Sequence, residues 1–153
     1  MELHEKIKQA LMEIKFIERY EELSNRFNRE RIPTTNRLVY VDGEEIMNEI
    51  SNLGYIPQFN TKEKFYKIEE EKFGDFIFGV HIILQSGMVD LVWIVKNGEE
   101  LLLGSPWSTY SRRLIDINYR IKKPVFGTYK DLDEILEYTF EMYEDFKKAL
   151  VHI

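Results

Sequence analysis

The stretch Phe76 to Leu103, FIFGVHIILQSGMVDLVWIVKNGEELLL, decides the fold class of this chain. Its β-branched and aromatic runs are separated only by Ser86-Gly87 and Asn97-Gly98. Dipeptides that end in glycine are typical of tight hairpin turns, and Asn-Gly suits a type I′ turn in particular. The pattern predicts three antiparallel strands, over residues 76–84, 88–96 and 99–103.

One more β-rich run, over residues 64–70, precedes this stretch and extends the prediction to a four-stranded antiparallel meander. Within residues 76–84, Phe76 and Phe78 fall on one face while Ile77 and Ile83 fall on the other. Both faces are therefore largely apolar. We expect this strand to be central and covered on both sides.

Long helices are expected at both ends of the chain. The first should run from about Glu2 to Arg29, because its apolar residues recur at steps of three and four. That stripe could pack on the sheet or seed a coiled-coil dimer. The last helix should begin where Thr128 and Asp131 form a cap. Its predicted buried stripe is Leu132, Ile135, Leu136, Met142, Tyr143, Phe146 and Leu150.

Two shorter helices are predicted between these ends. One begins at the cap residue Asp42 and stops at Gly54, and the other begins with Ser105 as its cap and runs toward Ile115. Residues 55–60 are expected to form a loop, because they contain a proline. Since the strands form one block in the chain, the order of elements predicts an α+β fold. We expect residues 1–153 to form a single domain, with one sheet of about four strands flanked by the long helices.

Composition and charge exclude several classes of function. The 153 residues have a net charge of −6 and contain no cysteine, which excludes thiol nucleophiles and thiolate metal sites. We expect no affinity for duplex DNA, because the net charge repels phosphates. The N-terminal residues lack the apolar core of a signal peptide, and no apolar run is long enough to span a bilayer. These features predict a cytoplasmic protein that does not bind a membrane.

Catalytic motifs are missing from the sequence. The glycines form no phosphate-binding loop, and the serines around Trp107 lie in no nucleophile elbow. The three histidines lack metal-ligand spacing, so we expect no metal and no cofactor. A carboxylate pair, Asp90 with Glu69 or Glu70, is the one acid–base arrangement that adjacent strands could bring together. The interpretation we favour is a protein that is not an enzyme.

Two segments are candidates for partner binding. The first contains Trp107, Tyr110, Arg112 and Arg113, residue types that are enriched in protein interfaces. Alternatively, Trp107 fills the core and the arginines are ordinary surface. The second is the acidic face of the last helix, which could meet a basic partner or keep the protein in solution. The acidic candidates are Glu134, Glu137 and Glu141.

The C-terminal sequence PVFGTYKDL, residues 124–132, followed by YEDFKK, residues 143–148, resembles the end of some bacterial immunity proteins. The resemblance covers about the last thirty residues. It implies a small acidic α+β protein of the cytosol that binds and neutralises a cognate toxin domain, often a nuclease with a basic active cleft. We expect such a protein to be a monomer or a weak homodimer.

A different class of function is also open. A module that binds nucleic acid or a phosphate ligand could use basic residues near the third quarter of the chain, with tyrosines that stack on bases. That cluster comprises Arg112, Arg113, Arg120, Lys122 and Lys123.

Overall fold

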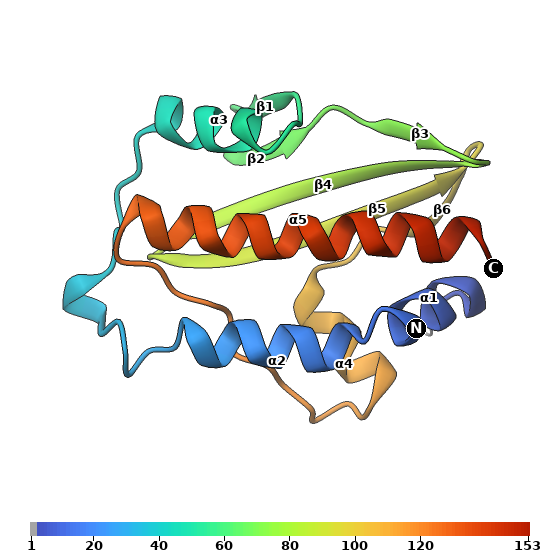
Figure 1. The fold of residues 1–153 in the computed structure, drawn as a ribbon, viewed down its shortest axis with the longest axis horizontal. Coiled ribbons are helices and arrows are strands. Elements are labelled where there is room, and N and C mark those ends of the chain that lie inside the picture. Colours follow the sequence, from blue (N-terminus) through green and yellow to red (C-terminus); the bar gives the residue numbers. More distant parts are fainter. Residues whose placement is uncertain (1–2) are drawn as a thin grey trace.

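The computed structural model describes residues 3–153, which form an α+β fold of five α-helices and one antiparallel sheet of six strands (Figure 1). The helices are α1 (Glu5–Glu13), α2 (Phe16–Arg26), α3 (Gly43–Asn52), α4 (Trp107–Leu114) and α5 (Tyr129–Val151), with a short 3₁₀ turn, η1 (Thr34–Asn36). The strands are β1 (Pro57–Asn60), β2 (Phe65–Ile68), β3 (Glu71–Phe73), β4 (Phe76–Gln85), β5 (Met88–Asn97) and β6 (Glu100–Leu103).

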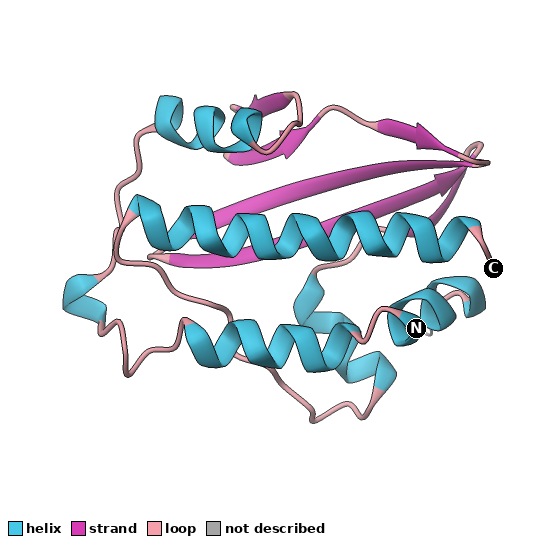
Figure 2. Cartoon of the chain, viewed as in Figure 1, coloured by secondary structure: helices cyan, strands magenta, loops and turns pink. Residues whose placement is uncertain are grey.

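The sheet has two more strands than the sequence predicts. Its order is β1-β2-β4-β5-β6, with β3 paired to the start of β4 (Figures 1 and 2). Residues 57–60, expected to be loop, form the edge strand β1, where Pro57 at the first position needs no ladder partner for its nitrogen. The run 64–70 gives only β2. Because β4 is ten residues long, β2 pairs near its middle and β3 pairs at its start.

The two glycine turns differ from each other. Ser86 and Gly87 both have positive φ values, 55° and 73°, which is the type I′ arrangement. At the next hairpin only Gly98 has a positive φ, 62°. The prediction of a type I′ turn at Asn97-Gly98 is wrong, because the register pairs Asn97 with Glu100 and leaves Gly98 and the residue after it as the turn.

The long N-terminal helix of the prediction is interrupted. Lys15 has a left-handed backbone, with φ 57° and ψ 49°, and separates α1 from α2. Arg19 Nη1 donates to the carbonyl of Ile14, 3.3 Å away, at the break. The turn directs Phe16 into the core, where its ring centroid lies 4.9 Å from that of Trp107. The expected start at Glu2 lies outside the described residues.

All five helices lie on one face of the sheet, so the prediction that they flank it, with β4 covered on both sides, is wrong (Figures 1 and 2). Trp93 of β5 is at the centre of the packed face, 4.7 Å from Phe146 of α5 and 5.1 Å from Trp107 of α4 between ring centroids. On the other face of β4, His81 is half-buried and stacks on Phe65 of β2 at 4.3 Å. Neighbours within the sheet thus shield this face in place of helices.

Two of the three helix caps predicted from the sequence are present in the structure. Asp42 Oδ1 accepts from the backbone N–H of Glu44, and Thr128 Oγ1 accepts from that of Asp131, as predicted. Every residue of the predicted α5 stripe is buried. The predicted cap at Ser105 is wrong: Pro106 occupies the cap position of α4, and no side chain caps the helix.

Candidate partner-binding surface

Two of the predicted interface residues are core residues. Trp107 is 2% exposed and Tyr110 is fully buried. The Trp107 ring lies 5.0 Å from that of Tyr20 in α2, and Tyr110 Oη accepts a hydrogen bond from the backbone N–H of Trp93. The structure therefore corrects their assignment to a binding surface and supports the core alternative for Trp107.

Arg112 and Arg113 do reach the surface of α4, where both are half-buried. Arg113 Nη1 donates to Ser105 Oγ at 3.3 Å, which ties this arginine to the segment before the helix. In Figure 1, α4 is seen behind α2 whereas α5 faces the viewer. The arginine pair and the acidic residues of α5 do not form one surface.

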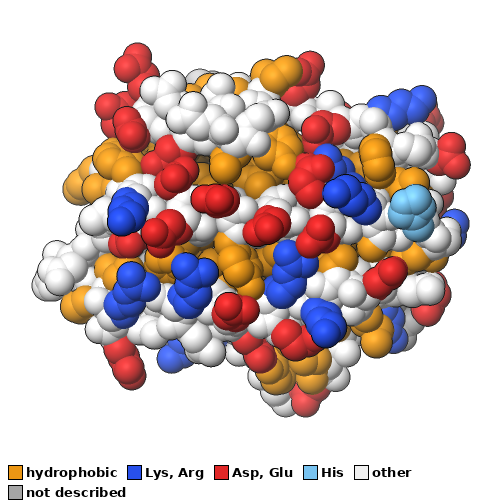
Figure 3. Space-filling view, in the orientation of Figure 1, with side chains coloured by type: hydrophobic (Ala, Val, Ile, Leu, Met, Phe, Trp, Pro, Cys, Tyr) orange, Lys and Arg blue, Asp and Glu red, His pale blue; other side chains and the backbone are white. Residues whose placement is uncertain are grey.

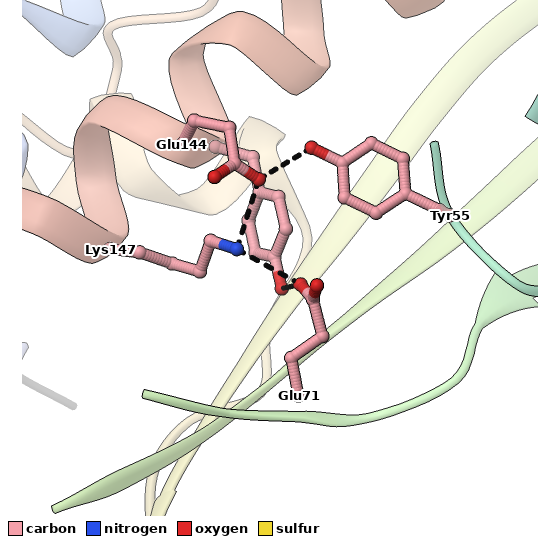
Figure 4. A network of polar contacts seen from close by, with 5 residues as sticks. Tyr55, Glu71, Glu144 and Lys147 are labelled. Atoms are coloured by element: carbon pink, nitrogen blue, oxygen red, sulfur yellow. Dashed lines mark hydrogen bonds and ion pairs between the residues drawn. The ribbon is translucent and has the colours of Figure 1, made fainter. Parts of the chain in front are cut away.

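The C-terminal half of α5 carries balanced charges. Arg19 Nη1 lies 2.9 Å from Asp145 Oδ2. Lys147 Nζ lies 2.9 Å from Glu144 Oε2 and 3.0 Å from Glu71 Oε1 of β3 (Figure 4). Glu144 and Asp145 are therefore already paired within the chain.

The buried ammonium of Lys147 is the centre of a polar network that joins three elements (Figure 4). Tyr143 Oη donates to Glu71 at 2.7 Å, and Tyr55 Oη, from the segment after α3, donates to Glu144 at 2.5 Å. Burial, followed by these hydrogen bonds to carboxylates, raises the pKa of both tyrosines well above the ordinary range. Both phenols stay protonated donors, so the network clamps α5 to β3 and to the end of α3.

The N-terminal half of α5 is different. Figure 3 shows acidic side chains gathered along α5 across this face of the molecule. The four from Asp133 to Glu141 make no ion pair with any residue between 3 and 153. Together with two glutamates of α3 they form what we call the acidic ridge. It consists of Glu45, Glu49, Asp133, Glu134, Glu137 and Glu141.

The pKa of the Glu49 carboxyl group reflects its burial and the negative charges around it. Its side chain is 7% exposed, and its Oε2 is buried without a hydrogen-bond partner in the described part of the chain. Burial, then the charge of Asp133, then that of Glu45, raise the pKa of Glu49 to about 7. The carboxylates of α3 and α5 thus act on one another, although the two helices lie far apart in sequence.

Two exposed aromatic side chains lie on the segments before and after α3. A pocket of about 550 Å³ between α3 and the β1–β2 hairpin is lined in part by Met47, Phe59 and Tyr66. Phe59 is 41% exposed and Tyr40, in the loop before α3, is 91% exposed. The N–H of Asp42 donates to Tyr129 Oη at 2.8 Å, which fixes this loop to the start of α5. Sequence reasoning missed both residues. Phe59, between Gln58 and Asn60, could have been recognised as an isolated aromatic in a polar segment, whereas Tyr40 lies in the apolar run 38–41 and gave no such signal.

Asp90 and Glu70, the possible acid–base pair, each form an ion pair with a lysine. Asp90 is opposite Ile83 in the ladder and pairs with Lys123 at 3.6 Å, whereas Glu70 pairs with Lys96 at 2.9 Å. Within residues 3–153, no three His, Asp or Glu side chains come together as a metal site would require.

In the same part of the chain, none of the helices combines the length and the apolar character needed to cross a bilayer. Comparisons with protein-family models, with curated proteins and with solved structures found no match to this chain.

Proposed function

We propose that this chain is a non-catalytic binding protein of the cytoplasm that neutralises a cognate toxin domain by direct contact, as bacterial immunity proteins do. The acidic ridge is the proposed contact surface. The observation that carries the proposal is the set of carboxylates from Asp133 to Glu141 of α5, which make no ion pair with any described residue. They lie next to Glu49, whose pKa is raised by burial and then by the charge of Asp133. A surface with this charge favours a cationic partner.

Electrostatics explains what such a surface would do. A nuclease toxin presents a basic cleft that is built to hold phosphates, and carboxylates can occupy the same cleft. Opposite charges also steer the two proteins together, which raises the association rate at low salt. Rapid capture is what an inhibitor of a toxin needs.

Apolar contacts would add affinity at one end of the ridge. Tyr40 and Phe59 are exposed, and Phe59 borders the pocket beside α3. Aromatic side chains supply much of the binding energy of protein interfaces when they become buried. We propose that these two residues are the aromatic anchors and that the ridge supplies the charge.

The proposal expects a toxin domain to be encoded beside the gene for this chain, and that domain is the partner for the test. Glu137→Lys/Glu141→Lys reverses two exposed charges of the ridge, and Glu99→Lys/Glu100→Lys makes the same change in net charge on the exposed β5–β6 turn. We expect the ridge variant to weaken binding by roughly tenfold or more and to reduce its salt dependence, with the control close to wild type. Surface plasmon resonance at low and high salt measures both.

Two results would contradict the proposal. One is that the toxin domain fails to bind the wild-type chain. The other is that both double variants lose affinity equally, because the effect would then come from net charge and not from the ridge. Melting curves of each variant establish that the chain is folded.

A further inference from the structure

A basic pocket lies on a part of the molecule that the proposed function does not use. It has a volume of about 380 Å³ and is bounded by the segment after α2, the first residue of β5, the first turn of α4 and the extended segment before α5. Four of its lining residues are cationic: Arg29, Arg120, Lys122 and Lys123. Ser108 adds a hydroxyl group.

The backbone that carries these cations is held firmly. The N–H of Val125 donates to the carbonyl of Phe27 at 2.8 Å, and the N–H of Val89 donates to that of Pro124 at 3.0 Å. Ser24 Oγ donates to the carbonyl of Lys122 at 2.6 Å. The segment therefore spans α2 and β5 in a fixed position, so that the basic residues meet at one place.

Little negative charge opposes this cluster. Asp90 Oδ2 lies 3.6 Å from Lys123 Nζ, and no other carboxylate of the described residues lies within 4 Å of the charged groups of Arg29, Arg120 or Lys122. Like charges that line one pocket repel one another, and a bound anion relieves the repulsion. The concentration of cations is notable in a chain whose net charge is −6.

We propose that this pocket binds the polyphosphate group of a small ligand. Arginine presents a planar fork and lysine a point charge to phosphate oxygens, and the serine hydroxyl supplies a further donor. The volume suits a small molecule, whereas the negative net charge opposes the long backbone of a nucleic acid. The site differs from the cluster expected from sequence, because Arg29 joins it and Arg112 and Arg113 do not line it. It is independent of the proposed function.

Calorimetric titration of the whole chain with inorganic tripolyphosphate, with ATP and with a single-stranded RNA oligonucleotide tests the proposal. Arg120→Gln/Lys122→Gln removes two cations from the pocket, and Arg112→Gln/Arg113→Gln removes two from the neighbouring helix as a matched control. We expect tripolyphosphate binding to weaken by about tenfold or more in the pocket variant and by less than about twofold in the control. Arg29→Gln, on a different segment, should weaken it as well.

The three probes distinguish the sources of phosphate. Tighter binding of ATP than of tripolyphosphate would support the proposal and add a contact to the nucleoside, and equal binding would support a site for polyphosphate alone. No binding of either at low salt would overturn it. So would tighter binding of RNA, or equal losses in the pocket variant and the control.

Discussion

Trp107 packs against three aromatic side chains from α2 and β5, and this determines what its removal does. Its ring centroid lies about 5 Å from those of Phe16, Tyr20 and Trp93. We expect Trp107→Ala to lower the free energy of unfolding by about 3 to 5 kcal/mol, because the change leaves a cavity in this cluster. Urea unfolding measures the loss.

Arg112→Ala, on the same helix, is the matched control and should change stability by less than about 0.5 kcal/mol. If Trp107→Ala kept wild-type stability, the side chain could not be part of the core.

The residue types from 107 to 113 could not distinguish an interface from a core, because Trp and Tyr are enriched in both. Spacing was the better signal. Trp107, Tyr110 and Ser111 are separated by three and four residues and are the buried residues of α4, with the arginines at other positions of the helix. Helical periodicity could therefore have indicated the buried side, whereas the prediction relied on composition alone.

At the scale of the element, the break between α1 and α2 places a lysine where the backbone favours glycine. A left-handed φ costs a non-glycine residue about 1 kcal/mol or more. We expect Lys15→Gly to stabilise the protein by up to about 1 kcal/mol, since glycine adopts this conformation without that strain. Thermal or urea unfolding tests it.

Lys8→Gly is the control, because Lys8 is exposed in the middle of α1 and glycine there should destabilise by about 1 kcal/mol. Equal losses in both variants would mean that residue 15 is helical in solution.

Helix ends were predictable only where side chains mark them. Thr128 and Asp42 are good caps, and the helices after them begin as expected. The break at Lys15 has no such mark: no glycine or proline is present, and the apolar spacing continues across it from Ile14 to Ile17. The turn is instead stabilised by tertiary packing, because it places Phe16 against Trp93 and Tyr110, which are distant in sequence.

At the scale of the whole molecule, Glu49 makes stability depend on pH. Its pKa is about 7 in the folded protein, raised from an ordinary value of 4.5. The folded state therefore holds a proton that the unfolded state releases, and stability falls as pH rises from the lower value through the higher one. We expect Glu49→Gln to remove this fall and to be more stable than wild type above neutral pH, by roughly 1 to 3 kcal/mol.

Urea unfolding between about pH 5 and pH 8 measures the difference. Glu137→Gln, on the exposed side of the same ridge, should follow the pH profile of the wild type. A Glu49→Gln profile parallel to that of the wild type would show that the glutamate is already ionised across this range.

Both proposed sites unite residues that are remote in the chain. The acidic ridge combines Glu45 with Glu141, and the basic pocket combines Arg29 with Arg120. Sequence patterns identified the acidic face of α5 and the basic residues near 120, because each lies within one segment. The partners from α3 and from the loop after α2 depend on tertiary packing, for which periodicity carries no signal.

Pro57, at the start of the edge strand β1, affects whether another chain can add a strand to the sheet. An exposed sheet edge can recruit a foreign strand through its free N–H and C=O groups, which leads to aggregation or to binding by strand addition. β1 is four residues long and Pro57 offers no N–H, while β6, at the opposite edge, is equally short and has a bulge within its pairing with β5. These two edges therefore offer a foreign strand few backbone groups to pair with. At both of them, contact with another chain is left mainly to side chains.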